Sequence, residues 1–564
     1  MKTDLLIIGG GLAGLTAAYE VLKAEPGRRI TILRPGAGSS PYVHGFNMPL
    51  NPQDSTELFI QDTEASGRGQ GNAALVEELC RGSLELLPFF DELGLDFNRE
   101  ADGSYQQLRP LGASCPRVIS IGNDAGGAIL RKLLTVMEQH ENVSVCTTLH
   151  ALRLITEDGR VCGAHCFDTQ SKRWMQIKAK AVILAAGGFC RIFPFSTNSA
   201  DLGGDAMAMA LDAGAELTDM EFVQFEPSAA VWPLAIAGKS VITTLFHEGA
   251  VLRNGKGERF MFRYSDKGEC ADKDVLSFAI ASEIAAGRGT EHGGVAFDAS
   301  GVGRERLEEA YSAYVKRYRA VGMDIAEQAM EIAPAAHTSL GGVYARPDCS
   351  TSVEGLFVCG ETLGGLHGAN RIGGNAGLET MVFGRRAGCS AAAYMDTLSG
   401  EPADCTDEIS DAAATVNIDA LRAELTKIVG GALGVIREAG KLEQAKTWQT
   451  FEFGPVLVED GKAATLPSSF YVNCHDGYYE PRTAIGQLGP LHYIVIVVDG
   501  RREGYSTGAS IPQLQQLFLD EGAEFAFNLD GGGSTTLYFR GEVVNMPSGG
   551  KERSVSDVIM FTAQ

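Results

Sequence analysis

A chain of 564 residues is too long for one ordinary domain and predicts three or four folded units. Its 45% hydrophobic and 21% charged residues are typical of a globular protein. The 48 Lys and Arg against 71 Asp and Glu leave a formal charge of −23, which disfavours nucleic acid and anionic membranes as partners. An anionic substrate would therefore need its own local group of cations.

Two further features of the composition predict a cytoplasmic protein. No apolar run approaches the roughly 20 residues of a membrane span, and the apolar N-terminal stretch lacks a cleavage site, so we expect neither a membrane segment nor a signal peptide. The 12 cysteines include no C-x-x-C pair, which favours buried thiols in a reducing compartment over disulfides or a zinc site. No metal site is predicted.

The first predicted element is a buried parallel strand over residues 5–8, followed by a glycine turn and a helix. Gly9 permits the tight turn, Gly11 lets backbone N–H groups approach a pyrophosphate, and Gly14 lets the helix pack closely on the strand. This context favours nucleotide binding over a merely tight turn. Arg34 ends the next strand, where an acidic residue usually holds a ribose hydroxyl. An arginine there could instead bind the 2′-phosphate of NADP, or it could simply be a solvated residue at the end of the strand.

The following segments alternate between helices and strands. Residues 38–47 read as a loop whose hydroxyl groups could reach a phosphate, residues 63–95 and 125–139 have helical spacing, and residues 143–154 read as a strand. Two more apolar strands are followed by a glycine, one by Ala186 and Gly187 and the other by Gly360, with Glu361 after it. Three such strands, far apart in the sequence, can meet on one bound molecule in a doubly wound sheet.

The predicted organisation is an α/β protein with five segments. A Rossmann-like nucleotide-binding domain occupies residues 1–219 and 331–400, and an inserted α+β capping domain lies between them at 220–330. A short helical segment follows at 401–445. Short alternating strands then replace long helices, so we expect a boundary near Ala445 and a mixed α+β domain over 449–564.

The first 400 residues resemble the FAD-dependent family of fumarate reductase, succinate dehydrogenase flavoprotein and L-aspartate oxidase. The resemblance rests on the glycine turn and on residues 181–188, 204–210, 220–227 and 336–384, the last including His367-Gly368-Ala369-Asn370-Arg371. It implies that the nucleotide is FAD, since several family members lack the acidic residue at the position of Arg34.

The resemblance also implies which residues bind FAD. The glycine turn, Arg34 and the two strand ends are expected to contact FAD. The further residues expected to bind it are Ser39, Ser40, Gly45, Asp205, Asn375 and Leu378. Glu361 can accept a hydrogen bond from a ribose or ribityl hydroxyl, and the helix starting near Gly374 directs its positive end toward the flavin. Because Ser39 aligns with the histidine that binds FAD covalently in some members, we expect dissociable FAD.

Four residues are expected to form the substrate site. Family enzymes transfer hydride between flavin and a dicarboxylate, and His337 and Arg371 match the pair that clamps one carboxylate. Two residues depart from the pattern, because Glu226 replaces a histidine that meets the second carboxylate and Lys273 replaces a proton-handling arginine. An ionised Glu226 would repel a dicarboxylate, whereas a buried lysine can still act as acid or base. Arg371 as a structural ion pair and His337 as a core histidine remain the alternatives.

Residues from about 453 to 561 resemble part of the phosphodiester glycosidase family, including the enzyme that removes N-acetylglucosamine from phosphomannose. The matching residues include Arg482, Asp499, Asp530 with the glycines after it, and Arg553. The arginines could hold a phosphodiester and an aspartate could supply acid or base, although Asp530 with its glycines also suits a plain hairpin turn. The family's N-terminal strands are missing.

We therefore expect an FAD-dependent oxidoreductase acting on a small carboxylate whose far end is polar or amino. The alternatives are a hydrolase working through the C-terminal domain and, given Glu226 and Lys273, an inactive flavin-binding protein. Because two truncated halves are joined at one point, an artefactual or decayed fusion also stays open. No haem or iron-sulfur ligands are encoded, so electrons must come from, or pass to, an external partner.

Overall fold

The computed structural model describes residues 1–402 except 123 and 200, and residues 456–466, 479–489, 492–501, 504, 506–529, 538–539 and 542–543. The chain forms two compact units, Met1–Arg437 and Glu438–Gln564. The predicted helical segment at 401–445 and the boundary near Ala445 lie almost wholly outside the described residues.

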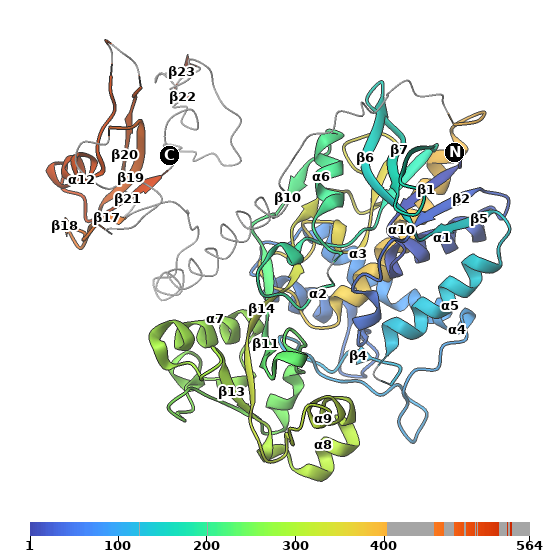
Figure 1. The fold of residues 1–564 in the computed structure, drawn as a ribbon, viewed down its shortest axis with the longest axis horizontal. Coiled ribbons are helices and arrows are strands. Elements are labelled where there is room, and N and C mark those ends of the chain that lie inside the picture. Colours follow the sequence, from blue (N-terminus) through green and yellow to red (C-terminus); the bar gives the residue numbers. More distant parts are fainter. Residues whose placement is uncertain are drawn as a thin grey trace. The chain divides into compact units, whose positions relative to one another are not determined.

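The first unit is organised around a five-stranded parallel sheet in the order β16-β9-β1-β2-β5 (Figure 1). Its strands are short, and all are buried except the edge strand β5, whose residues are half-buried or exposed: β1 (Leu5–Ile8), β2 (Ile30–Leu33), β5 (Val143–Cys146), β9 (Ala181–Leu184) and β16 (Leu356–Val358). Three helices pack with this sheet: α1 (Leu12–Ala24), α5 (Ala125–Gln139) and α10 (Asn375–Asp396). The three predicted apolar strands are thus confirmed as neighbours.

Smaller elements surround this sheet. The antiparallel sheet β6-β7-β8 contacts β9, and two strand pairs, β3 with β4 and β10 with β15, complete the region with four further helices. Their bounds are β6 (Leu149–Glu157), β7 (Arg160–Asp168), β8 (Arg173–Lys178), β3 (Phe46–Asn47), β4 (Val118–Ile119), β10 (Leu217–Thr218), β15 (Gly342–Val343), α2 (Thr56–Ser66), α3 (Ala73–Leu84), α4 (Leu86–Glu92) and α6 (Asp205–Asp212).

The structure refines two predicted elements. The helical stretch 63–95 is divided among α2, α3 and α4, because a glycine-rich loop follows Ser66 and the side chain of Asn72 caps a new helix. The strand predicted over 143–154 is two strands, since β5 belongs to the parallel sheet whereas β6 pairs with β7. The predicted helix 125–139 has the same bounds as α5.

The inserted region has its own sheet and its own hydrophobic core. Its antiparallel sheet has the order β11-β14-β13-β12, and α7, α8 and α9 pack with it (Figure 1). The elements are β11 (Val223–Trp232), β12 (Val251–Arg253), β13 (Val295–Asp298), β14 (Met330–Ser339), α7 (Lys273–Glu283), α8 (Arg304–Ala310) and α9 (Ser312–Arg319). Because β11 and β14 also lead into the nucleotide-binding region, residues on these two strands lie between the two cores.

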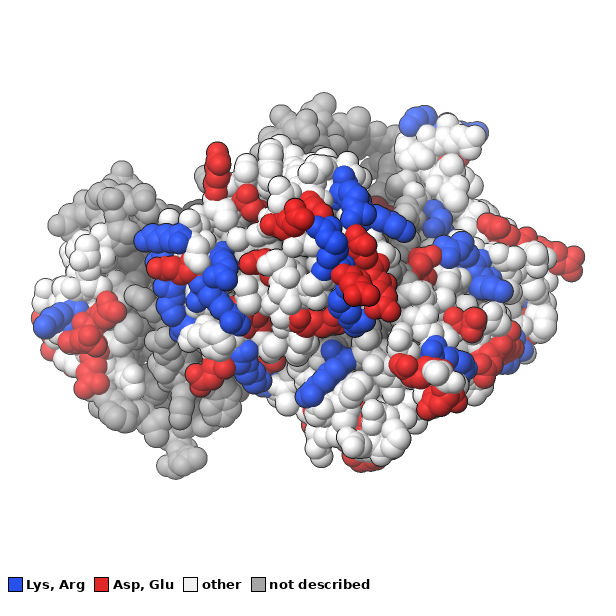
Figure 2. Space-filling model, turned by 90° about the horizontal axis from the view of Figure 1, so that it is seen from below, with Lys and Arg blue, Asp and Glu red and all other residues white. Residues whose placement is uncertain are grey.

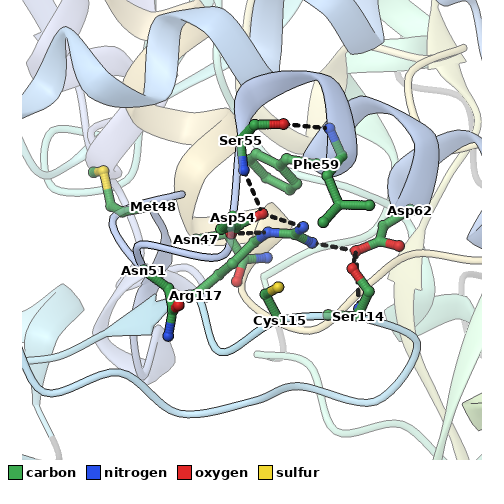
Figure 3. A network of polar contacts seen from close by, with 12 residues as sticks. Asn47, Met48, Asn51, Asp54, Ser55, Phe59, Asp62, Ser114, Cys115 and Arg117 are labelled. Atoms are coloured by element: carbon green, nitrogen blue, oxygen red, sulfur yellow. Dashed lines mark hydrogen bonds and ion pairs between the residues drawn. The ribbon is translucent and has the colours of Figure 1, made fainter.

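A buried arginine fixes the loop that precedes β4 (Figure 3). Arg117 is wholly buried and donates to Asp54 through Nε at 2.6 Å and Nη2 at 2.7 Å, and to Asp62 through Nη1 at 2.5 Å. Its guanidinium carbon lies 4.9 Å from the ring centroid of Phe59, and the hydroxyl of Ser114 donates to Asp62 at 2.7 Å. Two carboxylates thus neutralise and orient one buried cation.

The second unit contains an antiparallel sheet in the order β18-β17-β21-β19-β20. The strands are β17 (Val456–Glu459), β18 (Lys462–Ala463), β19 (Arg482–Gly489), β20 (His492–Val498) and β21 (Phe525–Leu529), and a separate pair joins β22 (Tyr538–Phe539) to β23 (Glu542–Val543). Helix α12 (Ile511–Asp520) begins with a capping box formed by Ser510 and Gln513 and packs Leu514 and Phe518 into the core.

Candidate functional site

The turn after β1 has the geometry of a nucleotide-binding turn. Gly9 has φ +116°, and a Cβ there would lie 2.1 Å from the carbonyl oxygen of Ala185 at the end of β9. A Cβ on Gly14 would lie 2.0 Å from the carbonyl oxygen of Gly9, and one on Gly11 would lie 2.7 Å from Oγ of Ser40. Only glycine therefore permits this close approach of strand, helix and loop.

The residues predicted around this turn gather beside it. The Nε of Arg34 donates to the carbonyl oxygen of Gly10 at 3.2 Å, and Oγ of Ser40 accepts from the backbone N–H of Leu12 at 2.9 Å. Ser39 lies in the same loop and donates to Oδ1 of Asn198 at 2.8 Å. The loop thus closes over the N-terminal end of α1, where a phosphate would bind.

The ends of β9 and β16 bring a carboxyl group to the same edge of the sheet. Glu361 accepts from the backbone N–H of Ser339 at 3.0 Å and lies 3.2 Å from its hydroxyl, and Thr362 donates to the carbonyl oxygen of Gly187 at 3.1 Å. Burial raises the pKa of Glu361 to about 7, against the opposing effect of the Ser339 N–H. This carboxyl can therefore both donate and accept a hydrogen bond near neutral pH. Ala186 and Gly187, also predicted, follow β9 directly.

The N-terminus of α10 provides a second set of groups. Gly374 caps the helix with φ +91°, and Asn47 donates from Nδ2 to the carbonyl oxygen of Gly373 at 2.8 Å and to Oδ1 of Asn375 at 2.6 Å. The Oδ1 of Asn47 is buried and has no hydrogen-bond partner among the described residues. An unused acceptor at a helix N-terminus suits a ligand that carries an N–H group.

Three other predicted FAD residues have different surroundings. Gly45 precedes β3, and a Cβ there would lie 2.4 Å from the carbonyl oxygen of Ile119. Leu378 is wholly buried in the core on α10, and Asp205 is exposed in the first turn of α6. Their assignment to the FAD site stays a prediction.

The predicted clamp pair lies at the junction of the two cores. Arg371 is buried, donates from Nη1 to the carbonyl oxygen of Ile372 at 3.0 Å, and has no carboxylate within 4.0 Å of its guanidinium among the described residues. Burial lowers the pKa of Arg371, whereas the more distant charges of Glu226, Glu379 and Glu361 raise it. The Nε of Arg371 is buried without a partner, which leaves it available to an anionic ligand.

A β-bulge directs His337 toward this site. In the pairing of β11 with β14, Gln224 faces Thr338 and Phe225 faces Ala336, so His337 is an extra residue. Its Nδ1 lies 2.7 Å from the hydroxyl of Thr197, and burial lowers its pKa to about 3. When Thr197 donates to Nδ1, the proton of the neutral imidazole is on Nε2, where it can be donated to a carboxylate.

The two residues that depart from the family pattern contact each other. Lys273, the first residue of α7, donates from Nζ to Oε2 of Glu226 on β11 at 2.5 Å. Their side chains are 13% and 5% exposed. Burial has the largest single effect and raises the pKa of Glu226, but the charge of Lys273, the smaller influence of His337 and the hydrogen bonds from Lys273 and Ser228 together outweigh it, so the net pKa is lowered. The expected isolated negative charge is thus one half of a buried ion pair.

Neighbouring groups complete this pair. His337 Nε2 lies 3.9 Å from Oε2 of Glu226, and the hydroxyl of Ser228 lies 3.0 Å from Oε1. Gln224 donates from Nε2 to the backbone carbonyl of Arg371 at 2.8 Å and to Oδ1 of Asn370 at 2.9 Å. Sequence reasoning missed Thr197, Gln224 and Ser228 as site residues. Only the proximity of Gln224 and Ser228 to Glu226 in the chain could have indicated them.

The C-terminal candidate site is described only in part. Arg482 begins β19, is buried, and donates from Nε to the carbonyl oxygen of Ala509 at 3.1 Å. Asp530 and Arg553 lie outside the described residues. The role of Arg482 and Asp530 in one site stays a prediction.

Neither a metal centre nor a membrane span is found in the part of the chain that the structure describes. No group of three or more His, Cys, Asp or Glu side chains there could hold a metal ion. None of the helices described combines the length and apolarity needed to cross a bilayer. On the face shown in Figure 2, acidic and basic side chains lie side by side, so the net negative charge does not form one uniform patch there.

Comparisons with known proteins agree with this geometry. Residues 4–376 match the FAD binding domain family, and residues 409–562 match the phosphodiester glycosidase family. A fumarate reductase (CoM/CoB) subunit from Methanothermobacter marburgensis is 37% identical over 69% of this chain and 72% of its own length. The L-aspartate oxidase of Caulobacter vibrioides is 33% identical over 80% of this chain and 88% of its own length.

A solved structure supports the same assignment. The quinol fumarate reductase flavoprotein of E. coli superposes with a TM-score of 0.66 at 28% identity, covering 76% of this chain and 74% of that one. The glycine turn, the carboxyl group of Glu361 and the unused acceptor of Asn47 fit FAD, which is the cofactor. The chain therefore belongs to the FAD-binding flavoprotein family of fumarate reductase and L-aspartate oxidase, and it is an FAD-dependent oxidoreductase.

Proposed function

We propose that this enzyme transfers a hydride between FAD and a small carboxylate whose far end is an uncharged polar or amino group. FAD, when bound, supplies the hydride acceptor or donor. The observation that carries the proposal is the Glu226–Lys273 ion pair, formed by the two residues that replace the histidine and the arginine of the family pattern. A second substrate carboxylate would have to approach ionised Glu226, at a cost of several kcal/mol when desolvated.

The four site residues then have separate roles. Arg371 and the Nε2 of His337 hold the substrate carboxylate, and the buried Nε of Arg371 gains a partner on binding. The Nζ of Lys273 supplies or accepts the proton that accompanies hydride transfer, and Glu226 holds this amine in place at 2.5 Å. We also propose that the region 220–330 closes over the reacting end of the flavin and that residues 1–219 and 331–400 hold the rest.

Flavin absorbance tests this proposal directly. The purified enzyme is mixed anaerobically with pairs of carboxylates that differ only at the far end. Fumarate is compared with its monoamide fumaramate and with crotonate after chemical reduction of the flavin, and aspartate is compared with asparagine before reduction. We expect the flavin spectrum to change faster with the monocarboxylate of each pair. Turnover of fumarate or aspartate at ordinary enzymatic rates, about 1–1000 per second, would show that Glu226 does not exclude a second carboxylate.

The match of residues 409–562 favours a second candidate activity in the C-terminal unit. We propose hydrolysis of a glycosyl phosphodiester, with Arg482 holding the phosphate and Asp530 serving as acid or base. Sugar release from a glycosyl phosphodiester measures this activity. Asp530→Asn should abolish it and leave the flavin spectrum unchanged, and failure of the wild-type chain to release sugar would refute the proposal.

A further inference from the structure

The substrate site is assembled from segments that belong to two separate hydrophobic cores. Arg371 precedes α10, which packs in the core of the parallel sheet, whereas Lys273 starts α7, which packs in the core of the inserted region. Charged side chains at the junction of two cores need specific contacts to keep their relative positions. A contact that holds the two segments together would therefore fix the position of Lys273 relative to Arg371, and with it the geometry of the reaction.

The loop after α2 is bound to the segment that leads to Arg371. The backbone N–H of Ala369 donates to the carbonyl oxygen of Gly67 at 3.1 Å, and that of Asn72 donates to the carbonyl oxygen of Gly365 at 2.7 Å. A Cβ on Gly67 would lie 2.6 Å from the carbonyl oxygen of His367, so the two backbones are in close contact. The loop 67–72 is thus held against the segment that leads to Arg371.

From this loop, Arg68 reaches the first turn of α7. Its Nη2 lies 2.6 Å from Oδ2 of Asp274 and 3.3 Å from Oδ2 of Asp272. These two carboxylates flank Lys273 in the sequence, and Asp272 is the N-cap residue of α7. Arg68 thus contacts both neighbours of the residue that binds Glu226.

We infer that Arg68 is a positioning residue that clamps α7, and with it Lys273, onto the segment carrying Arg371; its catalytic consequence rests on the proposed role of Lys273. Arg68 also neutralises the two carboxylates beside Lys273.

The test compares Arg68→Ala with Arg81→Ala. Arg81 is an exposed arginine on nearby α3, where it pairs with Glu77 on the same helix at 2.8 Å and is a matched control. In Arg68→Ala we expect faster hydrogen exchange over residues 272–283, a roughly three- to tenfold lower kcat, and a KM within about twofold of wild type because Arg371 and His337 still hold the carboxylate. Arg81→Ala should resemble wild type in all three.

Each outcome separates the clamp from the proposed function. Wild-type exchange over α7 in Arg68→Ala would overturn the clamp. Faster exchange with an unchanged kcat would overturn the positioning role, because α7 would then be held only for stability. Faster exchange in a protein whose wild type turns over none of the carboxylate pairs would support the clamp and refute the proposed function instead.

Discussion

Removing the charge of Glu226 gives the sharpest test of substrate choice. In Glu226→Gln, the buried Lys273 loses its counter-ion, and the far end of the site becomes net positive. A second substrate carboxylate can then pair with Nζ of Lys273 as Glu226 does at 2.5 Å. The substitution should therefore convert a site that rejects dicarboxylates into one that accepts them.

The magnitude follows from the geometry of the ion pair. Two unit charges about 4 Å apart at an effective dielectric constant of 20 attract by about 4 kcal/mol. Desolvation of the incoming carboxylate offsets part of this, so a net gain of about 1–3 kcal/mol is realistic. Since 1.4 kcal/mol is a factor of ten, the KM for fumarate should fall by roughly 5- to 150-fold relative to that for crotonate.

Flavin reoxidation by fumarate and by crotonate measures this ratio. Glu248→Gln is the matched control, because Glu248 pairs with Arg306 at 2.8 Å in the same inserted region but contacts no site residue. It should leave the ratio of the two KM values unchanged. A wild-type ratio in Glu226→Gln would refute the argument, since it would mean that Glu226 does not meet the far end of the substrate.

Three further predictions concern the cofactor and stability. Acid precipitation should leave the protein colourless and FAD in the supernatant, because Ser39 cannot form the histidyl link; flavin retained on the polypeptide would contradict this. The pKa of Glu361 is raised from 4.5 to about 7 in the folded protein, so the protonated carboxyl stabilises the fold at low pH. The free energy of unfolding of the apoprotein should therefore fall by up to about 3 kcal/mol as the pH rises from about 4.5 through 7. Denaturant titration of Glu361→Gln should not show this loss. Arg117→Met leaves the charges of Asp54 and Asp62 unpaired and should lower the free energy of unfolding by about 3–5 kcal/mol, as measured by denaturant titration. The control Arg131→Met removes an exposed ion pair and should lower it by less than about 1 kcal/mol. Equal losses in the two variants would refute the importance of the buried network.

Most of the nucleotide-binding region could be predicted from the sequence because its signals are local. An apolar run followed by a glycine predicts a strand end without knowledge of its neighbours, and β1, β9 and β16 have this form. Gly9 is required by its own φ of +116° and by a backbone contact that every such turn makes. Nucleotide binding therefore followed from residues within short windows, and the resemblance of several segments to one family identified the nucleotide as FAD.

The character of the substrate site was decided only by tertiary structure. Sequence alone indicated Glu226 and Lys273 as separate departures and predicted an isolated negative charge. Their contact depends on α7 packing beside β11, and the position of His337 depends on a bulge in the pairing of β11 with β14. These are properties of elements about 50 to 110 residues apart, which no local pattern encodes. The sequence by itself determined the cofactor, whereas the packing of distant elements determined which charges lie together at the proposed substrate site.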